Sequence, residues 1–215
     1  MEQFYKLLKE YNINFIAKVV DVPEWFLQYT EDEPPLYWKT VYEILKYEDR
    51  NQSIVEIGAG YGDITALLYF MGFRNIISFE YDTNLIFPIE DKIKYLFGIQ
   101  PNIVNNTYPQ TLSYKPNILI QVNCVYPINI TNKAEYLKQI RNFYEVNGVP
   151  VLYIFEYINE IYSSENEVFP KFIRLNNGDI SHLFPDCKIE SYYTYKFPIN
   201  KTTKKICTIK ILEYV

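Results

Sequence analysis

Three glycines at alternate positions follow an apolar run that carries one acidic residue. The segment reads Val55-Glu56-Ile57-Gly58-Ala59-Gly60-Tyr61-Gly62-Asp63-Ile64-Thr65. Glycine has no Cβ, so it adopts positive φ and lets a ligand lie close against the backbone. A helix that begins directly afterwards offers free N–H groups and the positive end of its dipole to that ligand. The spacing predicts a strand, a tight turn and a helix, the first unit of a nucleotide-binding α/β domain.

A second acidic residue ends the next apolar run, Ile76-Ile77-Ser78-Phe79-Glu80. Glu80 lies twenty residues after Gly60. At this place in a nucleotide-binding unit, a carboxylate can accept hydrogen bonds from both ribose hydroxyls. The two acidic residues and the glycines therefore form one candidate binding site.

The glycine spacing differs from the dinucleotide fingerprint G-x-G-x-x-G. Gly58-x-Gly60-x-Gly62, with Glu56 two residues ahead, resembles motif I (E/D-x-G-x-G-x-G) of the class I S-adenosylmethionine-dependent methyltransferases. Glu80 matches the acidic ribose-binding residue of that family. The resemblance covers residues 53–82 by motif and, more loosely, 41–215 by order of elements. A glycine-rich turn in another doubly wound fold is the alternative.

The resemblance implies S-adenosyl-L-methionine as cofactor and gives roles to particular residues. Gly58, Gly60 and Gly62 would line its methionine and ribose, Glu80 would bind the ribose hydroxyls, and Glu56 would lie near the methionine ammonium. Asp82 would either touch the adenosine or cap a helix. Asn106 would either accept a hydrogen bond from the adenine amino group or form a turn. Asn123 would line the transfer site. Tyr126 is expected to contact the substrate there.

A hydroxyl acceptor also needs a general base. His182 is the only histidine of the chain and falls in a short predicted helix capped by Asp179. Glu156 is the second candidate, because it is expected at the carboxyl end of the fifth strand. Each has a plain structural alternative, as a surface histidine and a strand-end carboxylate. If neither lines the site, the acceptor must need little proton removal.

The remaining pattern predicts the elements that position these residues. Residues 1–52 are expected to form an N-terminal helical cap, and residues 53–215 an S-adenosylmethionine-binding, Rossmann-like domain. Within that domain the chain alternates strands at 53–57, 76–80, 102–104, 118–122 and 149–155 with helices at 64–71, 84–97, 133–146 and 180–184, which predicts a mostly parallel sheet. Two β-rich runs at 187–195 and 204–213 predict a C-terminal antiparallel hairpin. This α/β order is that of the class I methyltransferase sheet.

Composition narrows the function. The chain has 215 residues, a net charge of −5 and a sequence pI of about 5.1. Its one short basic cluster lies at 201–205, so no nucleic-acid partner is expected. No apolar run of about 18 residues indicates a membrane span. Three widely spaced cysteines suggest neither disulfides nor a metal site, and the cytoplasm is the simplest location.

These features favour a methyltransferase acting on oxygen or nitrogen of a small molecule. Motif I is also locally similar to that of sugar O-methyltransferases, so a sugar is one candidate acceptor. The alternatives are a protein or RNA methyltransferase, a non-catalytic protein that keeps the fold, and an aminopropyl transferase, for which no convincing set of acidic residues is present.

Overall fold

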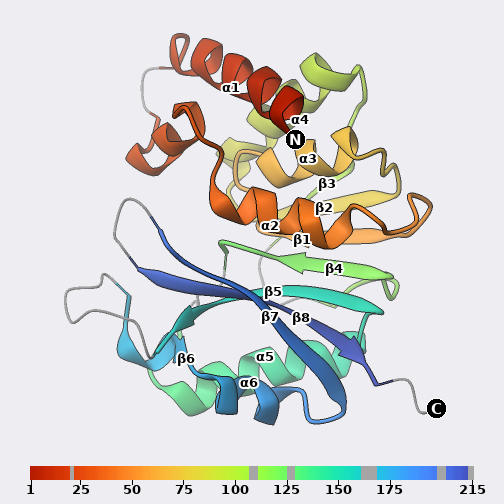
Figure 1. The fold of residues 1–215 in the computed structure, drawn as a ribbon, viewed down its shortest axis with the longest axis vertical. Coiled ribbons are helices and arrows are strands. Elements are labelled where there is room, and N and C mark those ends of the chain that lie inside the picture. Colours follow the sequence, from red (N-terminus) through yellow and green to blue (C-terminus); the bar gives the residue numbers. More distant parts are fainter. Residues whose placement is uncertain (20–21, 107–110, 125–128, 161–168, 198–201, 213–215) are drawn as a thin grey trace.

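The structure is a computed structural model that describes residues 1–19, 22–106, 111–124, 129–160, 169–197 and 202–212. Its centre is one sheet with the strand order β3-β2-β1-β4-β5-β8-β7 (Figure 1). The strands are β1 (Ile54–Ile57), β2 (Ile76–Glu80), β3 (Ile103–Asn105), β4 (Ile118–Gln121), β5 (Leu152–Asn159), β6 (Arg174–Leu175), β7 (Cys187–Lys196) and β8 (Thr203–Ile211). The short β6 pairs with β5 outside this path.

The first five strands are parallel to one another, and β8 runs antiparallel between β5 and β7. The predicted mostly parallel sheet with a C-terminal antiparallel hairpin is therefore confirmed. The strand order reverses between β1 and β4. The chain runs from β1 through β2 to β3 on one side of this point and from β4 to β5 on the other. In open α/β sheets, ligands bind at such a switch point.

Helices cover both faces of the sheet (Figure 1). One face carries α1 (Glu2–Ile16), the 3₁₀ segment η1 (Glu24–Thr30), α2 (Leu36–Leu45), α3 (Asp63–Phe70) and α4 (Thr83–Phe97). The other carries α5 (Lys133–Asn147), the 3₁₀ segment η2 (Lys171–Ile173) and α6 (Asn177–Leu183). Each layer encloses its own hydrophobic core.

Helix α3 shows why the N-terminal residues are needed. Nearly all of its side chains are buried, on every side of the helix. A helix that is apolar all round must be covered all round. The sheet covers one side, and α1, α2 and α4 cover the rest. The first 45 residues thus hold the helix that follows the glycine loop. The division at residue 52 into two folding units stays a prediction, which limited proteolysis would test.

Strand β5 differs from its prediction at both ends. It begins at Leu152 and continues to Asn159. The later start follows Pro150, which cannot donate a backbone hydrogen bond to a ladder. The extension is set by pairing, because Tyr157 and Ile158 face Lys205 and Lys204 of β8. Glu156 therefore lies inside the strand, opposite Ile206, and not at its carboxyl end.

Candidate functional site

A cavity of about 960 Å³ opens at the carboxyl ends of β1, β2 and β4. Its volume is near the top of the range of about 300–1,000 Å³ for small-molecule sites. The glycine loop forms its floor, and the N-terminal segments form a wall. Its chemically notable lining residues are Glu56, Gly58, Gly60, Tyr61, Asp63, Glu80, Asp82, Asn106, Asn123, Cys124, Trp25, Tyr29, Tyr37, Trp38 and Phe197.

The three glycines of the loop have different roles. Their φ angles are 74°, 58° and 78° for Gly58, Gly60 and Gly62, so each adopts the left-handed region. A Cβ at Gly58 would collide with Cys124, and one at Gly62 would lie 2.8 Å from Ile89 Cγ2. A Cβ at Gly60 would meet no atom within 4 Å. Gly60 therefore leaves space for a ligand, whereas Gly58 and Gly62 permit close packing of the protein itself.

Gly62 does not line the cavity, contrary to its expected contact with the ligand. It is the N-cap of α3 and allows that helix to begin against α4. Its place in the motif is explained by the close approach of two helices.

Glu80 organises the glycine loop. Its Oε2 accepts a hydrogen bond of 2.7 Å from Gly60 N–H, and its Oε1 accepts one of 2.9 Å from Asp82 N–H. The side chain is 4% exposed and lines the cavity. Each carboxylate oxygen has lone pairs beyond the one used here. Glu80 can therefore hold the loop and still accept hydrogen bonds from a diol.

Glu56 lies deeper, at 2% exposure, with Oε2 accepting hydrogen bonds from Thr65 Oγ1 (2.5 Å) and Ser78 Oγ (2.7 Å). Burial raises the pKa of Glu56 to about 7, and the two hydroxyl donors oppose this rise. Because Glu56 lines the cavity, a cationic group bound there would favour its ionised form.

Asp82 and Asn106 lie at the β2–α4 side of the same cavity. Asp82 is the N-cap of α4, and its Oδ1 accepts a hydrogen bond of 2.9 Å from Asn84 N–H. It thus has the capping role considered for it and also lines the cavity. Asn106 is joined to β2 through its backbone, which donates 3.0 Å to Glu80 O. Both remain proposed cofactor contacts.

Asn123 follows β4 and adopts a φ of 60°, which is uncommon outside glycine. Its N–H donates 3.0 Å to Glu156 Oε1, and its Oδ1 accepts from Lys204 Nζ. Lys204 Nζ also lies 3.0 Å from Glu156 Oε1, while Tyr195 Oη donates to Glu156 Oε2. A buried ion pair thus fixes the turn at the end of β4.

Glu156 is not placed as a general base. It is 2% exposed, accepts a hydrogen bond from the Asn123 backbone and is absent from the cavity lining. Both of its carboxylate oxygens already accept hydrogen bonds from Asn123, Lys204 and Tyr195. Because β5 extends past it, Glu156 supports the site from within the sheet.

His182 lies on the surface of α6, exposed, in a separate depression shared with α5. That helix begins at Asn177 and is capped by Asn176 through a capping box with Asp179. His182 does not line the large cavity. This position removes it from the chemistry expected at the glycine loop. Tyr126, the expected substrate contact, lies outside the described residues.

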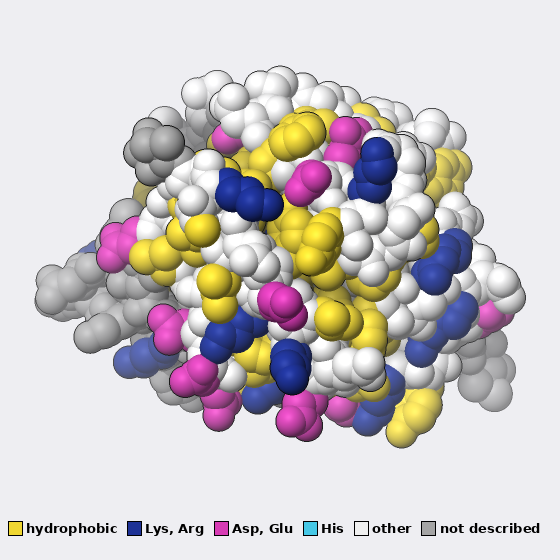
Figure 2. All heavy atoms as spheres, turned by 90° about the horizontal axis from the view of Figure 1, so that it is seen from above, with side chains coloured by type: hydrophobic (Ala, Val, Ile, Leu, Met, Phe, Trp, Pro, Cys, Tyr) yellow, Lys and Arg dark blue, Asp and Glu magenta, His cyan; other side chains and the backbone are white. Residues whose placement is uncertain are grey.

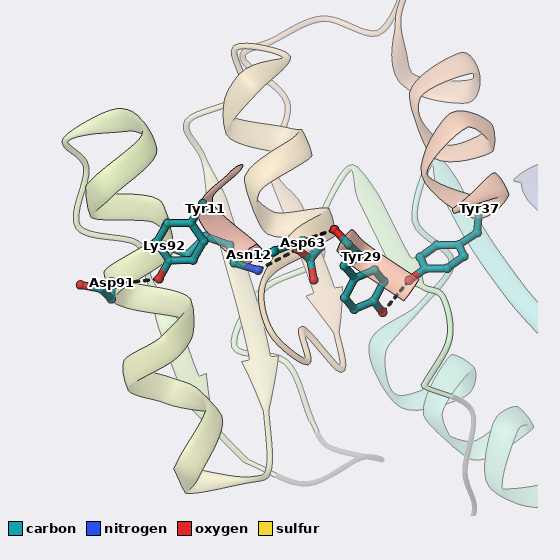
Figure 3. A network of polar contacts seen from close by, with 7 residues as sticks. All are labelled: Tyr11, Asn12, Tyr29, Tyr37, Asp63, Asp91 and Lys92. Atoms are coloured by element: carbon teal, nitrogen blue, oxygen red, sulfur yellow. Dashed lines mark hydrogen bonds and ion pairs between the residues drawn. The ribbon is translucent and has the colours of Figure 1, made fainter. Parts of the chain in front are cut away.

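A buried polar network, which sequence reasoning missed, ties the N-terminal segments to the glycine loop (Figure 3). Lys92 Nζ of α4 lies 2.7 Å from Oδ1 of Asp63, the first residue of α3. Asn12 Nδ2 of α1 donates 3.3 Å to that same oxygen and 3.4 Å to Tyr29 O. Tyr37 Oη of α2 donates 2.7 Å to Tyr29 Oη. The signal of this network in the sequence was Lys92, a charged residue between the apolar residues Ile89 and Ile93.

We predict that Lys92→Met lowers the free energy of unfolding by about 3–5 kcal/mol, because it leaves the buried Asp63 without a counter-ion. Both partners are at most 5% exposed, and burial raises the pKa of Asp63 and lowers that of Lys92. The double variant Asp63→Asn/Lys92→Met should recover most of the loss. Urea denaturation measures both. A single variant within about 1 kcal/mol of the parent would show that the pair contributes little.

The fold has counterparts among solved structures, although no protein-family model and no curated protein matches the chain. Among solved structures, the chain is similar to magnesium protoporphyrin IX methyltransferase (ChlM) from Synechocystis PCC 6803 with bound SAM, with a TM-score of 0.60, 12% identity and coverage of 96% of this chain and 97% of that one. This is the class I methyltransferase fold.

Two further structures share this class I methyltransferase fold. The CcbJ methyltransferase from Streptomyces caelestis has a TM-score of 0.62 at 9% identity and covers 84% of this chain and 91% of its own. The methyltransferase domain of bacterial CtHen1 has a TM-score of 0.59 at 11% identity, with 81% and 97% covered. The fold is thus shared at sequence identities of 9–12%.

Two properties bear on ligands and partners. Among the described residues, no group of three or more His, Cys, Asp or Glu side chains is arranged to hold a metal ion, and no helix has the length and apolar character needed to cross a membrane. On the face above α1 and η1, Lys and Arg side chains are scattered among acidic and hydrophobic ones (Figure 2). That face offers no continuous basic surface for phosphates.

Proposed function

We propose that this chain is an S-adenosylmethionine-dependent methyltransferase that transfers a methyl group to oxygen or nitrogen of a small molecule. One observation carries the proposal: a glycine loop with a left-handed, unobstructed Gly60 whose N–H is held by Glu80, at the floor of a 960 Å³ cavity. When bound, the cofactor supplies a sulfonium methyl group that passes to an acceptor lone pair, the C–S electron pair remaining on sulfur.

The residues present fit this cofactor. Gly60 leaves open space beside the backbone, Glu80 has free lone pairs for the ribose hydroxyls, and Glu56 offers a carboxylate for the ammonium. Asp82, Asn106 and Asn123 also line the cavity, and we assign Asp82 and Asn106 to the adenosine and Asn123 to the transfer site. The role of these residues is to orient the cofactor and exclude water, since the methyl group is already activated.

The size and lining of the cavity support a small-molecule acceptor. It can hold a cofactor together with a second small molecule, and its wall comes from α1, η1 and α2. The solved ChlM and PhzM structures, named for magnesium protoporphyrin IX and for pyocyanin biosynthesis, have a related fold. A sugar stays within the proposed class. On the face seen in Figure 2, the scattered charges offer no basic surface that would support an RNA acceptor. With free cysteines throughout, we propose a reducing cytoplasm as its location.

Isothermal titration with S-adenosylmethionine or its demethylated product tests the proposal. Glu80→Ala removes a charged acceptor and the support of the Gly60 N–H, so we expect binding weakened by about 1.5–3 kcal/mol. Glu90→Ala removes the same charge from α4 away from the cavity and should bind as the parent does. If the parent protein binds neither ligand at about millimolar concentration, which corresponds to a binding free energy of about 4 kcal/mol, the proposed function is rejected.

A further inference from the structure

The amide of Asn123 has a fixed orientation in the cavity wall. An ammonium group has only hydrogen-bond donors, so the Asn123 atom facing Lys204 Nζ must be the oxygen Oδ1. Lys204 is 1% exposed and is not part of the cavity lining, whereas Asn123 is. The amide oxygen therefore points away from the cavity. The Nδ2 group, which has no hydrogen bond to any residue that the structure describes, is left to face it.

The surrounding contacts lock this orientation. Glu156 Oε1 lies 3.0 Å from both Lys204 Nζ and the Asn123 backbone nitrogen, so one carboxylate holds the lysine and the turn together. Tyr195 Oη occupies the other oxygen of Glu156. Rotating the Asn123 amide would place its NH₂ against an ammonium group. The side chain of Asn123 therefore presents donors, and no acceptor, to whatever occupies the cavity beside it.

A donor at this place distinguishes oxygen from nitrogen acceptors. An oxygen anion has several lone pairs, so it can accept a hydrogen bond with one and form a bond to carbon with another. A neutral amine has a single lone pair, and a hydrogen bond from Asn123 would occupy the pair needed for transfer. An ammonium group has no lone pair and would face Nδ2–H with like polarity. The amide thus favours oxygen.

Aromatic rings bound the space next to Asn123; we call Tyr29, Tyr37, Trp38 and Phe197 the aromatic wall. All four line the cavity. The rings of Tyr29 and Trp38 are stacked, with centroids 5.2 Å apart. The rings of Tyr37 and Tyr195 lie 6.0 Å apart, and Lys204 Nζ lies 4.7 Å from the Phe197 ring, so the wall adjoins the cluster that holds Asn123. Flat rings favour a flat, aromatic partner.

None of the four carboxylates that line the described part of the cavity is available as a base for an ordinary alcohol. Asp63 is paired with Lys92, Glu80 accepts two backbone N–H groups, and Asp82 caps α4. Glu56 is committed to the cofactor in the proposed function. Because an aliphatic hydroxyl keeps its proton near neutral pH without such a base, an oxygen that ionises by itself fits the site better.

We propose that the acceptor is a flat aromatic compound whose reacting oxygen enters as an anion, a phenolate or an aromatic carboxylate, and accepts a hydrogen bond from Asn123 Nδ2. This inference rests on the proposed function and names the substrate class of the same cavity. Transfer to such an oxygen forms a C–O bond as the methyl–sulfur bond breaks, and the protein needs to move no proton.

The test uses the full chain saturated with S-adenosylhomocysteine, which cannot turn over. Calorimetry first establishes that this ligand binds; if it does not, the proposed function fails and the acceptor inference falls with it. Saturation-transfer NMR then measures the affinities of four probes: benzoate, para-cyanophenol at about pH 8, benzylamine and cyclohexanecarboxylate. We expect the two aromatic oxygen probes to bind at least about tenfold more tightly than the other two.

Asn123→Asp keeps the shape of the side chain but replaces the donor by an acceptor. It should weaken benzoate binding by about tenfold or more while S-adenosylhomocysteine still binds. Asn129→Asp is the matched control, because Asn129 is exposed, has a φ of 61° and does not line the cavity. It should leave benzoate affinity unchanged. With S-adenosylmethionine in place, mass spectrometry should detect the methyl ester or methyl ether.

Three results would overturn the inference while S-adenosylhomocysteine still binds. These are benzylamine binding as tightly as benzoate, cyclohexanecarboxylate binding as tightly as benzoate, and undiminished benzoate binding by Asn123→Asp. Circular dichroism checks that the variant is folded. If it is not, the comparison of the four probes on the parent protein decides alone.

Discussion

Gly60→Val is expected to abolish S-adenosylmethionine binding while the chain remains folded. A Cβ at Gly60 would meet no protein atom within 4 Å, so the valine side chain would extend into the space proposed for the ligand. The φ of 58° is also strained for a β-branched residue, which threatens the N–H bond to Glu80. Isothermal titration should show at least about a hundredfold loss, or roughly 2.7 kcal/mol.

Gly98→Val provides a matched control for backbone strain. Gly98 has a φ of 67°, has no atom within 4 Å of the position that a Cβ would take, and is the C-cap of α4, away from the cavity. Both variants should lose a similar free energy of unfolding, about 1–2 kcal/mol from the left-handed backbone. Only Gly60→Val should lose the ligand. Equal affinity of the Gly60 variant and the parent would show that the ligand has been placed wrongly.

The sequence predicted the features of the site that depend on neighbouring residues. Glu56, the glycine loop and Glu80 lie within 25 residues of one another, and their order reflects a single strand–turn–helix–strand unit. Strand β2 occupies its predicted range, Ile76–Glu80, because an apolar run ends there at a carboxylate that binds the loop. Such local patterns determine local structure with little help from the rest of the chain.

Features that depend on distant pairing were not predictable in the same way. The end of β5 is set by its pairing with β8 and β6, so the chain around Glu156 alone could not show that this residue lies inside a strand. The position of His182 depends on which face of the sheet α6 packs against; Arg141 of α5 donates 2.8 Å to Leu183 O and holds it beside α5. The Asp63–Lys92 pair joins α3 to α4 across 29 positions.

Glu56 should make cofactor affinity depend on pH. Its carboxyl group has a pKa of about 7 in the free protein, raised chiefly by burial and further by the charges of Glu80 and Asp63. Binding the cofactor's ammonium needs the carboxylate, so each pH unit below about 7 should weaken binding up to tenfold. Calorimetry at about pH 5 should then give an affinity roughly 10²-fold below that at about pH 7.5.

Glu56→Gln separates this effect from the titration of the cofactor itself. The variant cannot ionise, so the ratio of parent to variant affinity should be largest near pH 7.5 and shrink towards about pH 5. Its absolute affinity at the higher pH should be below that of the parent, because the charged partner of the ammonium is lost. A parent affinity that stays constant between these pH values would remove Glu56 from the cofactor site.

The same substitution should stabilise the free protein at neutral and higher pH. Below the unfolded pKa of 4.5 both states carry the proton, so Glu56 contributes nothing to the pH dependence. As pH rises from 4.5 to about 7, the unfolded chain releases the proton first, and stability falls. Above that range the buried carboxylate costs about 3 kcal/mol. Urea denaturation of Glu56→Gln should therefore show a gain of this order at about pH 8 and none near pH 4. The parent thus gives up stability at Glu56 to keep a carboxylate in the cavity, and a gain in stability accompanied by weaker cofactor binding in the variant would demonstrate that trade.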